Sequence, residues 1–247
     1  MPKVSIITPC YNCKEEFSNT FNSVINQTYK DFEWIIIDDC SNDDSFNFIA
    51  ELIKPFNNFK LLKTKNNSGP AVSRNLGIKE ATGDYIAFLD SDDKWKENKL
   101  EKQIEFMEST GYVFTYTNYD VFENGKSKLY CPKSNFQDYK KLLRGSNIGC
   151  STVIYNCREI GKKYMPIDVF KREDYAMWLD ITKNGVIAHK LNDSLTIYTI
   201  SRNSFSSKKL SLMPYAYKVY RKHEKMNIFK SHFYLFCIVF NKIFFKY

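Results

Sequence analysis

The sequence predicts an α/β protein whose central sheet is mostly parallel and is flanked by helices. Over residues 1–95, short apolar runs rich in Val, Ile, Phe and Leu alternate with segments whose apolar residues recur at helical spacing. This alternation of strands and helices predicts a mostly parallel sheet whose strands are joined by right-handed crossovers. The 247 residues suit one large domain with an appendage.

Four strands and three helices are expected in this first part. The predicted strands cover residues 4–9, 32–39, 59–63 and 85–89, and the predicted helices cover residues 14–26, 41–54 and 71–81. Pro9 ends the first strand because proline has no N–H for the ladder. Pro70 suits the first turn of the third helix, and Gly83 closes that helix. The carboxyl ends of the strands should share one edge of the sheet, where open α/β sheets bind ligands.

The second part is less regular. Helices are expected at residues 98–109 and 168–184, strands at 112–119, 151–155, 186–190 and 195–201, and a hairpin turn at 123–126. The stretch between residues 120 and 150 shows no clear period and no motif. Its role therefore depends on what surrounds it.

Charge is concentrated at the C-terminal end. The net charge is +8, yet residues 202–247 carry ten basic residues and one acid, which leaves residues 1–201 close to neutral. Nucleic acid and an anionic membrane are the two usual partners of such a segment. The seven cysteines are odd in number and irregularly spaced, which indicates reduced thiols in a cytoplasm.

A basic, aromatic helical tail is predicted for residues 206–247. Residues 210–226 have helical spacing with Lys, Arg and Tyr, and an apolar run follows at 233–240. This run is shorter than the ~20 residues that span a bilayer, so it suits a helix lying in the membrane interface. Packing of the tail on the enzyme's own body or on a second subunit is the alternative, which leaves a homodimer open.

Three carboxylates mark the end of the fourth strand. The apolar run 85–89 passes directly into Asp90, Ser91, Asp92 and Asp93. Unpaired carboxylates are costly inside a sheet, so these acids are expected where the strand leaves it. Carboxylate oxygens suit a hard divalent cation, which would screen the charge of a phosphate leaving group.

Five motifs together resemble the inverting, nucleotide-sugar-dependent glycosyltransferases of family 2, which have the GT-A fold. They lie at residues 4–12, 35–43, 73–77 and 83–93, and at Glu173-Asp174 with Trp178. They occur in the family's order and spacing over residues 3–205. The resemblance implies a GT-A domain at residues 1–205, with a nucleotide-binding half at 1–95 and an acceptor half at 96–205. The overall likeness is to bacterial enzymes that build O-antigen, lipooligosaccharide or capsule.

The resemblance also implies roles for the strand-end residues. Asp39 would accept a hydrogen bond from the uracil of the donor, and Asp92 would coordinate Mn²⁺ or Mg²⁺ directly. Asp90 would contact the ribose or the metal and its waters. The implied donor-binding set is Thr8, Pro9, Tyr11, Asp39, Arg74, Asp90 and Ser91.

For the acceptor side, the resemblance implies that Asp174 is the catalytic base. It would take the proton of the acceptor hydroxyl during an inverting displacement. Glu173 and Trp178 are candidate acceptor contacts, with a buried structural position as an equal alternative for Trp178. The motif-free stretch 120–165 is expected to form the acceptor pocket. Arg202 matches a loop that closes over the diphosphate, although the family's usual His is missing before Asn203.

The expected activity is transfer of a hexose from UDP-glucose or UDP-galactose to a lipid-linked or lipopolysaccharide or capsule glycan. The expected location is the inner face of a bacterial plasma membrane, bound peripherally through residues 208–247. A dinucleotide-binding enzyme is excluded because residues 8–12 contain no Gly. A non-catalytic sugar-binding or nucleic-acid-binding protein with a basic tail is the alternative. Nucleic acid is not expected as a partner, because strand-end acids repel phosphate unless a metal intervenes.

Overall fold

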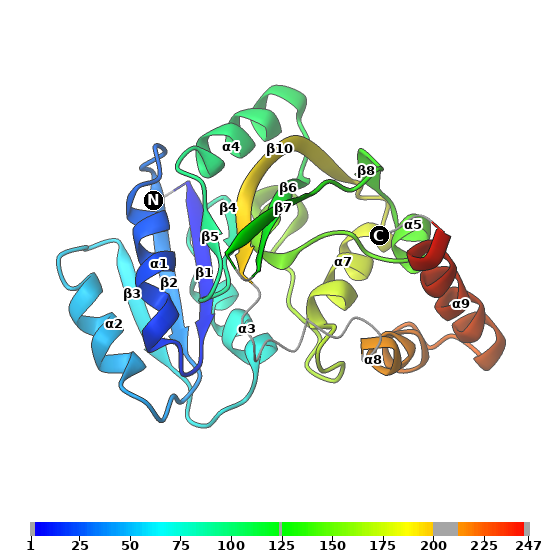
Figure 1. Cartoon of the computed structure of the whole chain (residues 1–247), viewed down its shortest axis with the longest axis horizontal. Helices are drawn as coiled ribbons and strands as arrows, with labels where there is room; N and C mark the ends of the chain where they lie inside the picture. Colours follow the sequence, from blue (N-terminus) through cyan, green and yellow to red (C-terminus); the bar gives the residue numbers. More distant parts are fainter. Residues whose placement is uncertain (1–2, 124, 200–211, 245–247) are drawn as a thin grey trace.

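The computed structural model describes residues 3–123, 125–199 and 212–244. Within them, ten strands form one sheet in the order β3-β2-β1-β4-β9-β6-β10-β5, with β7 paired to β6 and β8 paired to β10 (Figure 1). The strands are β1 Val4–Cys10, β2 Phe32–Asp38, β3 Phe59–Lys63, β4 Tyr85–Phe88, β5 Lys94–Trp95, β6 Phe114–Glu123, β7 Lys126–Tyr130, β8 Phe136–Gln137, β9 Ile154–Asn156 and β10 Ala188–Thr199.

The first four strands form a parallel block. β1 lies between β2 and β4, and both neighbours run parallel to it. The β1–β2 register runs from Val4 opposite Phe32 to Cys10 opposite Asp38, so the two strands end side by side. This confirms the predicted fold class. It also places the turns that follow β1 and β2 next to each other.

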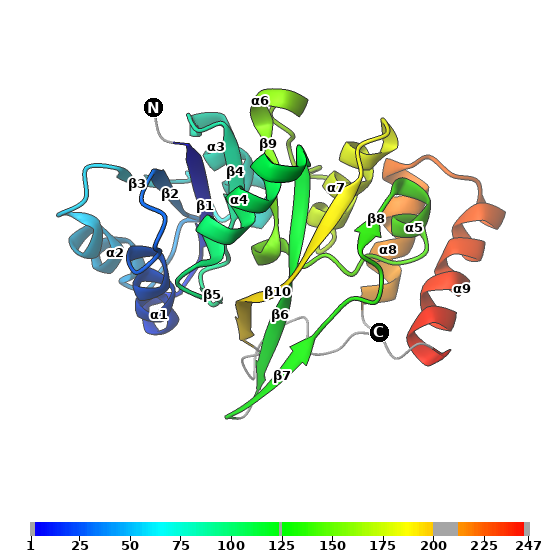
Figure 2. The ribbon, with the colours of Figure 1, turned by 90° about the horizontal axis from the view of Figure 1, so that it is seen from above.

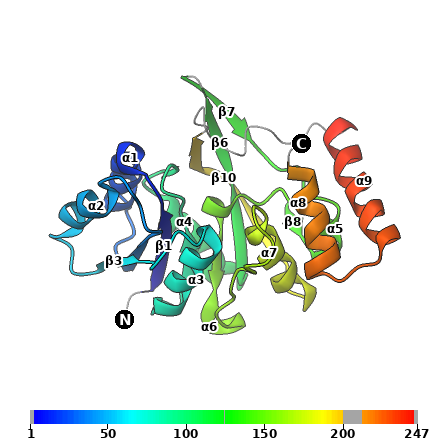
Figure 3. The same cartoon turned by 90° about the horizontal axis from the view of Figure 1, so that it is seen from below.

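Helices cover both faces of this block. The helices of the chain are α1 Lys14–Ile25, α2 Ser45–Ile53, α3 Pro70–Glu80, α4 Lys99–Thr110, α5 Tyr139–Leu143, α6 Cys157–Ile160, α7 Glu173–Lys183, α8 Met213–Lys218 and α9 Ile228–Phe244. Apolar residues of α1, α2 and α4 pack in one core cluster, and those of α3, α5 and α7 pack in the other. Figure 3 shows α1 and α2 on one side of the parallel strands and α3 on the opposite side.

The part of the sheet that follows β4 is mixed rather than parallel. β9 runs antiparallel to both β4 and β6, while β10 runs parallel to β6. The two strands expected at residues 186–190 and 195–201 are one strand, β10, with register shifts near Ser194. The helix expected from residue 168 begins only at Glu173, because Lys171 takes a positive φ of 65° that interrupts a helix. Figure 2 shows β6 and β10 crossing the middle of the molecule.

The described part of the tail packs on the body. After α8, residues Val219–His223 form a π-helical turn, η4, and α9 follows. Ala216, Val219, Tyr220 and Ile238 belong to the same core cluster as residues of α7. Figures 1 and 3 show α8 and α9 at the same end of the molecule as α5 and α7. Within residues 3–123, 125–199 and 212–244, no helix is long and apolar enough to cross a membrane.

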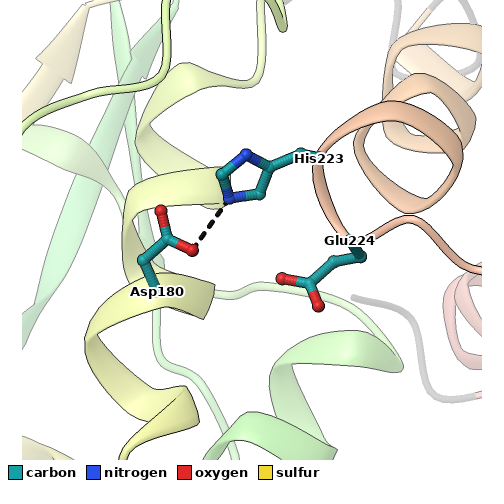
Figure 4. Close-up of side chains that lie close together, drawn as sticks. All are labelled: Asp180, His223 and Glu224. Carbon is teal, nitrogen blue, oxygen red and sulfur yellow. Dashed lines mark hydrogen bonds and ion pairs between the residues drawn. The ribbon is translucent and has the colours of Figure 1, made fainter.

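A polar clasp also ties the tail to α7 (Figure 4). His223 lies 2.8 Å from the Oδ1 of Asp180, and Lys183 lies 2.9 Å from the Oε2 of Glu224. Glu224 is almost fully buried and also accepts a hydrogen bond from the Tyr139 hydroxyl. The one acid of the tail is therefore used inside the protein, whereas Lys218, Lys222, Lys225 and Lys230 are exposed.

Candidate active site

The turns after β1 and β2 brace each other. The backbone N–H of Asn12 donates to Ser41 Oγ at 3.0 Å, and the Asn42 N–H donates to Asn12 Oδ1 at 3.0 Å. Asn12 and Cys40 both have positive φ, at 49° and 59°. Asn tolerates this region better than most side chains, so the positive φ of Asn12 costs little free energy. The pair of turns forms a fixed platform at the end of the sheet.

The predicted donor residues of the first turn differ in exposure. Tyr11 is 46% exposed, so its ring is available to a ligand. Thr8 is fully buried, and its hydroxyl accepts a hydrogen bond of 2.9 Å from the Trp34 indole N–H. Pro9 lies between them and is half-buried. The Thr8 side chain supports the strand end from beneath, whereas Tyr11 faces outward.

Asp39 organises the loop that leads into α3. Its carboxylate accepts hydrogen bonds from Thr64 Oγ1 at 2.8 Å, from the Ser68 N–H at 3.1 Å and from the Gly69 N–H at 2.7 Å. Gly69 has a φ of +85°, which an L side chain adopts at a cost. Asp39 is thus both buried and rigidly oriented, and its contact with uracil remains a prediction.

Arg74 connects the two halves of the site. It is buried on α3, its Nη2 lies 2.5 Å from Asp90 Oδ1, and its Nη1 lies 3.7 Å from Glu173 Oε1. An always-charged guanidinium between two carboxylates fixes both of them. The end of β4 and the start of α7 are thereby held together, although they are far apart in the sequence.

The three acids after β4 have different surroundings. Asp93 is buried and accepts hydrogen bonds from Ser151 Oγ at 2.6 Å and from the Thr199 N–H at 3.2 Å. It therefore shapes the loop, together with Thr20, whose hydroxyl bonds the backbone oxygens of Ser91 and Asp93. Asp92 is left for a ligand.

Asp92 and Asp90 fit a divalent cation. Burial and the neighbouring Asp90 raise the pKa of Asp92 to about 6. Across residues 3–123, 125–199 and 212–244, Asp92 forms no ion pair. Arg74 pairs with Asp90 and not with Asp92 among the described residues. The hard carboxylate oxygens of the two acids match Mg²⁺ or Mn²⁺, which takes one or two carboxylates and completes its shell with phosphates and water.

A cavity of about 590 Å³ opens beside these acids. Its walls come from the end of β4, from η1 (Cys150–Thr152), and from α5, α7 and α9. Asp90, Asp93, Asp174 and Ile238 all line it. The volume suits a small-molecule ligand such as one or two sugar units.

Asp174 stands at the first turn of α7 and faces this cavity. Its Oδ1 accepts a hydrogen bond of 2.7 Å from the Tyr175 N–H. Burial raises its pKa, while Arg172 and Arg74 act in the opposite direction. Burial thus makes this carboxylate a stronger base than an ordinary Asp.

Of the remaining candidates, Trp178 requires a correction. It is fully buried, with its ring 5.2 Å from that of Phe114 and 6.0 Å from that of Phe88. No ring face is left for a sugar, because the apolar stripe of α7 turns this position into the core. Glu173 is buried beside Arg74, and burial raises its pKa. Arg202 lies outside the described residues.

The structure shows how two further residues support the site: Ser151, which sequence reasoning missed, and Asn75, which lies in the motif at residues 73–77. Ser151 accepts a hydrogen bond from the Asp90 N–H at 3.1 Å while it donates to Asp93, so it positions the acid loop. Asn75 exchanges two hydrogen bonds with the backbone of Met165, which anchors the stretch before α7. Ser151 lies in a motif-free stretch, so only its tertiary contacts reveal it.

Strand-end turns with an acid pair, next to a cavity that holds a buried base, define a nucleotide-binding α/β enzyme. A family model described as "Glycosyl transferase family 2" matches residues 5–164. The chain is 37% identical to the putative teichuronic acid biosynthesis glycosyltransferase TuaG of Bacillus subtilis, over 93% of this chain and 92% of that protein. It is 38% identical to the UDP-Glc:alpha-D-GlcNAc-diphosphoundecaprenol beta-1,3-glucosyltransferase WfaP of Escherichia coli, over 85% of this chain and 82% of that protein.

Solved structures share the fold. Staphylococcus aureus TarS 1-349 in complex with UDP-GlcNAc aligns with a TM-score of 0.73 at 19% identity, over 98% of this chain and 73% of that chain. The mannosyltransferase PcManGT from Pyrobaculum calidifontis, in complex with GDP-Man and Mn²⁺, aligns with a TM-score of 0.71 at 15% identity. The alignment covers 96% of this chain and 72% of that chain. The chain belongs to the family 2 glycosyltransferases and has the GT-A fold. It is a nucleotide-sugar-dependent glycosyltransferase, so the non-catalytic alternative does not hold.

Proposed function

We propose that this enzyme transfers a hexose from UDP-glucose or UDP-galactose to a lipid-linked surface glycan by an inverting single displacement. One observation carries the proposal: Asp174 and Asp90 line the same cavity. The proposed base and the first acid of the motif after β4 therefore face the same space. The names of WfaP, a UDP-Glc transferase, and of TuaG support the donor and the glycan class.

The donor would lie across the turns after β1 and β2. Tyr11 offers an aromatic face for the base, and Asp39 is held nearby by three donors from the loop before α3. The diphosphate would follow toward Asp92, with Arg74 and Asp90 at the sugar end. These residues form a rigid cradle, so little ordering is required when the donor binds.

Asp92, with Asp90 in support, would hold Mn²⁺ or Mg²⁺. When bound there, the cation would stabilise the negative charge of the UDP leaving group. The protein supplies the two neighbouring carboxylates. Ser151, the Asp93 backbone N–H and Arg74 all contact Asp90 and hold this loop in place.

Asp174 would act on the acceptor. As the acceptor oxygen bonds to C1 of the sugar, the C1–O bond to the diphosphate breaks and UDP leaves with the bonding electrons. The hydroxyl proton passes to the Asp174 carboxylate. Attack from the face opposite UDP inverts the anomeric centre, so an α-linked donor gives a β-linked product. Glu173 is oriented by Arg74 and is a second polar group beside the acceptor position.

The outer face of α9 suits a bilayer surface. Ser231 and Ile238 face the body, whereas large apolar residues point outward, with Phe229 being 87% exposed. The exposed apolar residues of this helix are Ile228, Phe229, Phe233, Phe236 and Phe240. Exposed Lys222, Lys225 and Lys230 lie next to them, where they would meet lipid phosphates. This arrangement supports peripheral association with the inner face of a bacterial plasma membrane.

The test is UDP release from a panel of UDP-sugars, with Mn²⁺ and with EDTA, because slow donor hydrolysis requires no acceptor. We expect release from one hexose donor only, dependent on metal, and lost in Asp92→Ala. Asp168→Ala, which changes an exposed acid in the loop before α7, is the matched control. Metal-independent release, or equal release from Asp92→Ala, would overturn the assignment of Asp92.

A further inference from the structure

The cavity that holds Asp174 also carries three cationic side chains. Lys141 and Arg144 come from the end of α5, and Arg172 precedes α7 by one residue. We propose that these three residues bind a phosphate or diphosphate carried by the acceptor. This proposal rests on the transferase function above and names the acceptor class for the same site.

Within residues 3–123, 125–199 and 212–244, none of the three cations is fixed by a carboxylate in an ion pair, although Arg172 lies close enough to Asp174 to oppose the rise in the pKa of that carboxyl group. Lys141 Nζ donates to two neutral oxygens, Ser134 Oγ at 3.1 Å and the Phe136 carbonyl at 3.5 Å, and lies 3.1 Å from the centroid of the Phe136 ring, so no anion neutralises its charge among the described residues. The Nε of Arg172 is buried and has no hydrogen-bond partner in the same ranges. A buried donor without a partner is costly, so a ligand that accepts hydrogen bonds is expected here.

Hydrogen bonds fix the position of this cationic wall. The Tyr175 hydroxyl donates to the Leu142 carbonyl at 2.9 Å, which fastens α5 to α7. The Tyr220 hydroxyl donates to the Leu143 carbonyl at 2.6 Å, and Asn241 Nδ2 donates to the Arg144 carbonyl at 3.0 Å. Elements from the acceptor half and from the tail therefore hold Lys141 and Arg144 against the cavity without using their charges.

The charge pattern distinguishes the acceptor from the donor. The donor diphosphate is assigned to Asp92, which does not line this cavity. An acceptor whose hydroxyl reaches Asp174 would extend away from Asp90, toward α5 and α9. Guanidinium groups form bidentate hydrogen bonds with phosphate, so an anionic group next to the acceptor sugar matches this wall. Electrically neutral acceptors would leave all three charges without partners.

A lipid attached to such an acceptor could leave the cavity past α9. Ile238 and Asn241 of α9 line the cavity, while the opposite face of α9 carries the exposed aromatic residues described above. A lipid attached beyond the phosphate would pass α9 on its way to the membrane surface. The combined pattern indicates a sugar joined through a diphosphate to a lipid.

The first experiment measures binding directly by calorimetry. The probes are N-acetylglucosamine linked through a diphosphate to a short lipid, the same sugar diphosphate without lipid, and the neutral octyl glycoside. We expect both diphosphates to bind at least about tenfold more tightly than the glycoside, because hydrogen bonds to charged groups have that magnitude. The difference between the two diphosphates separates a lipid-linked source from a free sugar phosphate.

The variants Lys141→Gln and Arg144→Gln should each weaken diphosphate binding by about tenfold and leave binding of the neutral glycoside unchanged. Arg158→Gln is the control, because Arg158 is exposed on α6 and does not line the cavity. Equal binding of charged and neutral probes by the wild type would overturn the proposal. So would a loss of UDP affinity in Lys141→Gln or Arg144→Gln, since these cations would then serve the donor. Failure of the transferase function would instead appear as absence of UDP binding in the wild type.

Discussion

The two halves of this enzyme, residues 1–95 and 96–205, build their candidate sites in different ways. In the first half, parallel strands end side by side, and each turn carries its functional residue within a few positions of the strand. In the second half, the cavity is lined by β6, β10 and the loop 144–149 together with α5, η1, α7 and α9, and hydrogen bonds between distant residues join several of these segments. The proposed donor site is thus a property of local sequence, whereas the proposed acceptor site is a property of the tertiary fold.

The largest effect should come from removing the base. Asp174→Asn should lower kcat about 1,000-fold, because general base catalysis contributes ~10²–10⁴. UDP affinity should persist, since the donor is held by the other half. Transfer kinetics and calorimetry on the same preparations provide the two readouts, with Asp168→Asn as control. Transfer within tenfold of wild type would show that another group takes the proton.

The junction between the halves is the next most sensitive point. Arg74→Met leaves Asp90 and buried Glu173 without their cation and should destabilise the fold by about 3 kcal/mol. Denaturant unfolding measures this loss. The control is Arg158→Met, whose exposed ion pair with Asp84 should contribute less than about 1 kcal/mol. Similar losses in both variants would mean that Arg74 does not link the halves.

The contrast between the halves also explains what could be read from the sequence. The parallel block, the acid motif and the position of Asp174 follow from apolar periodicity and from motifs close to strand or helix ends. For Trp178, the sequence left an acceptor contact and a buried position open, and only the packing on Phe88 and Phe114 decides for the buried position. Ser151 and the cationic wall depend on chain segments that meet only in the folded state.

The third prediction, with a smaller expected effect, concerns membrane binding by the outer face of α9. Its inner face belongs to the core, so deleting it would damage the enzyme, whereas point changes on the outer face should not. Phe229→Ser should weaken binding to anionic vesicles by about tenfold, since burial of a Phe side chain contributes about 1.5 kcal/mol or more. Tyr164→Ser changes an exposed aromatic residue elsewhere and is the control in a vesicle sedimentation assay. Unchanged sedimentation of Phe229→Ser would argue against the α9 surface as the membrane contact.

The smallest effect concerns pH. Burial raises the pKa of Asp174, and the base must be ionised, so kcat/KM should fall as pH decreases through a midpoint above the usual ~3.9 of an Asp. The same shift means that the native state holds this proton more tightly than the unfolded state. Its contribution to stability therefore decreases as pH rises through that window. A pH–rate profile that stays flat down to pH 4 would contradict the buried-base assignment.

The most direct test of the division between the two halves is a crystal structure with UDP and Mn²⁺. We expect the uracil between Tyr11 and Asp39 and the diphosphate beside Asp92, with the cavity near Lys141 and Arg144 free of nucleotide. That result would place the donor entirely on the strand-end turns. Nucleotide density against Lys141 and Arg144 would contradict it, because the cationic wall would then belong to the donor site.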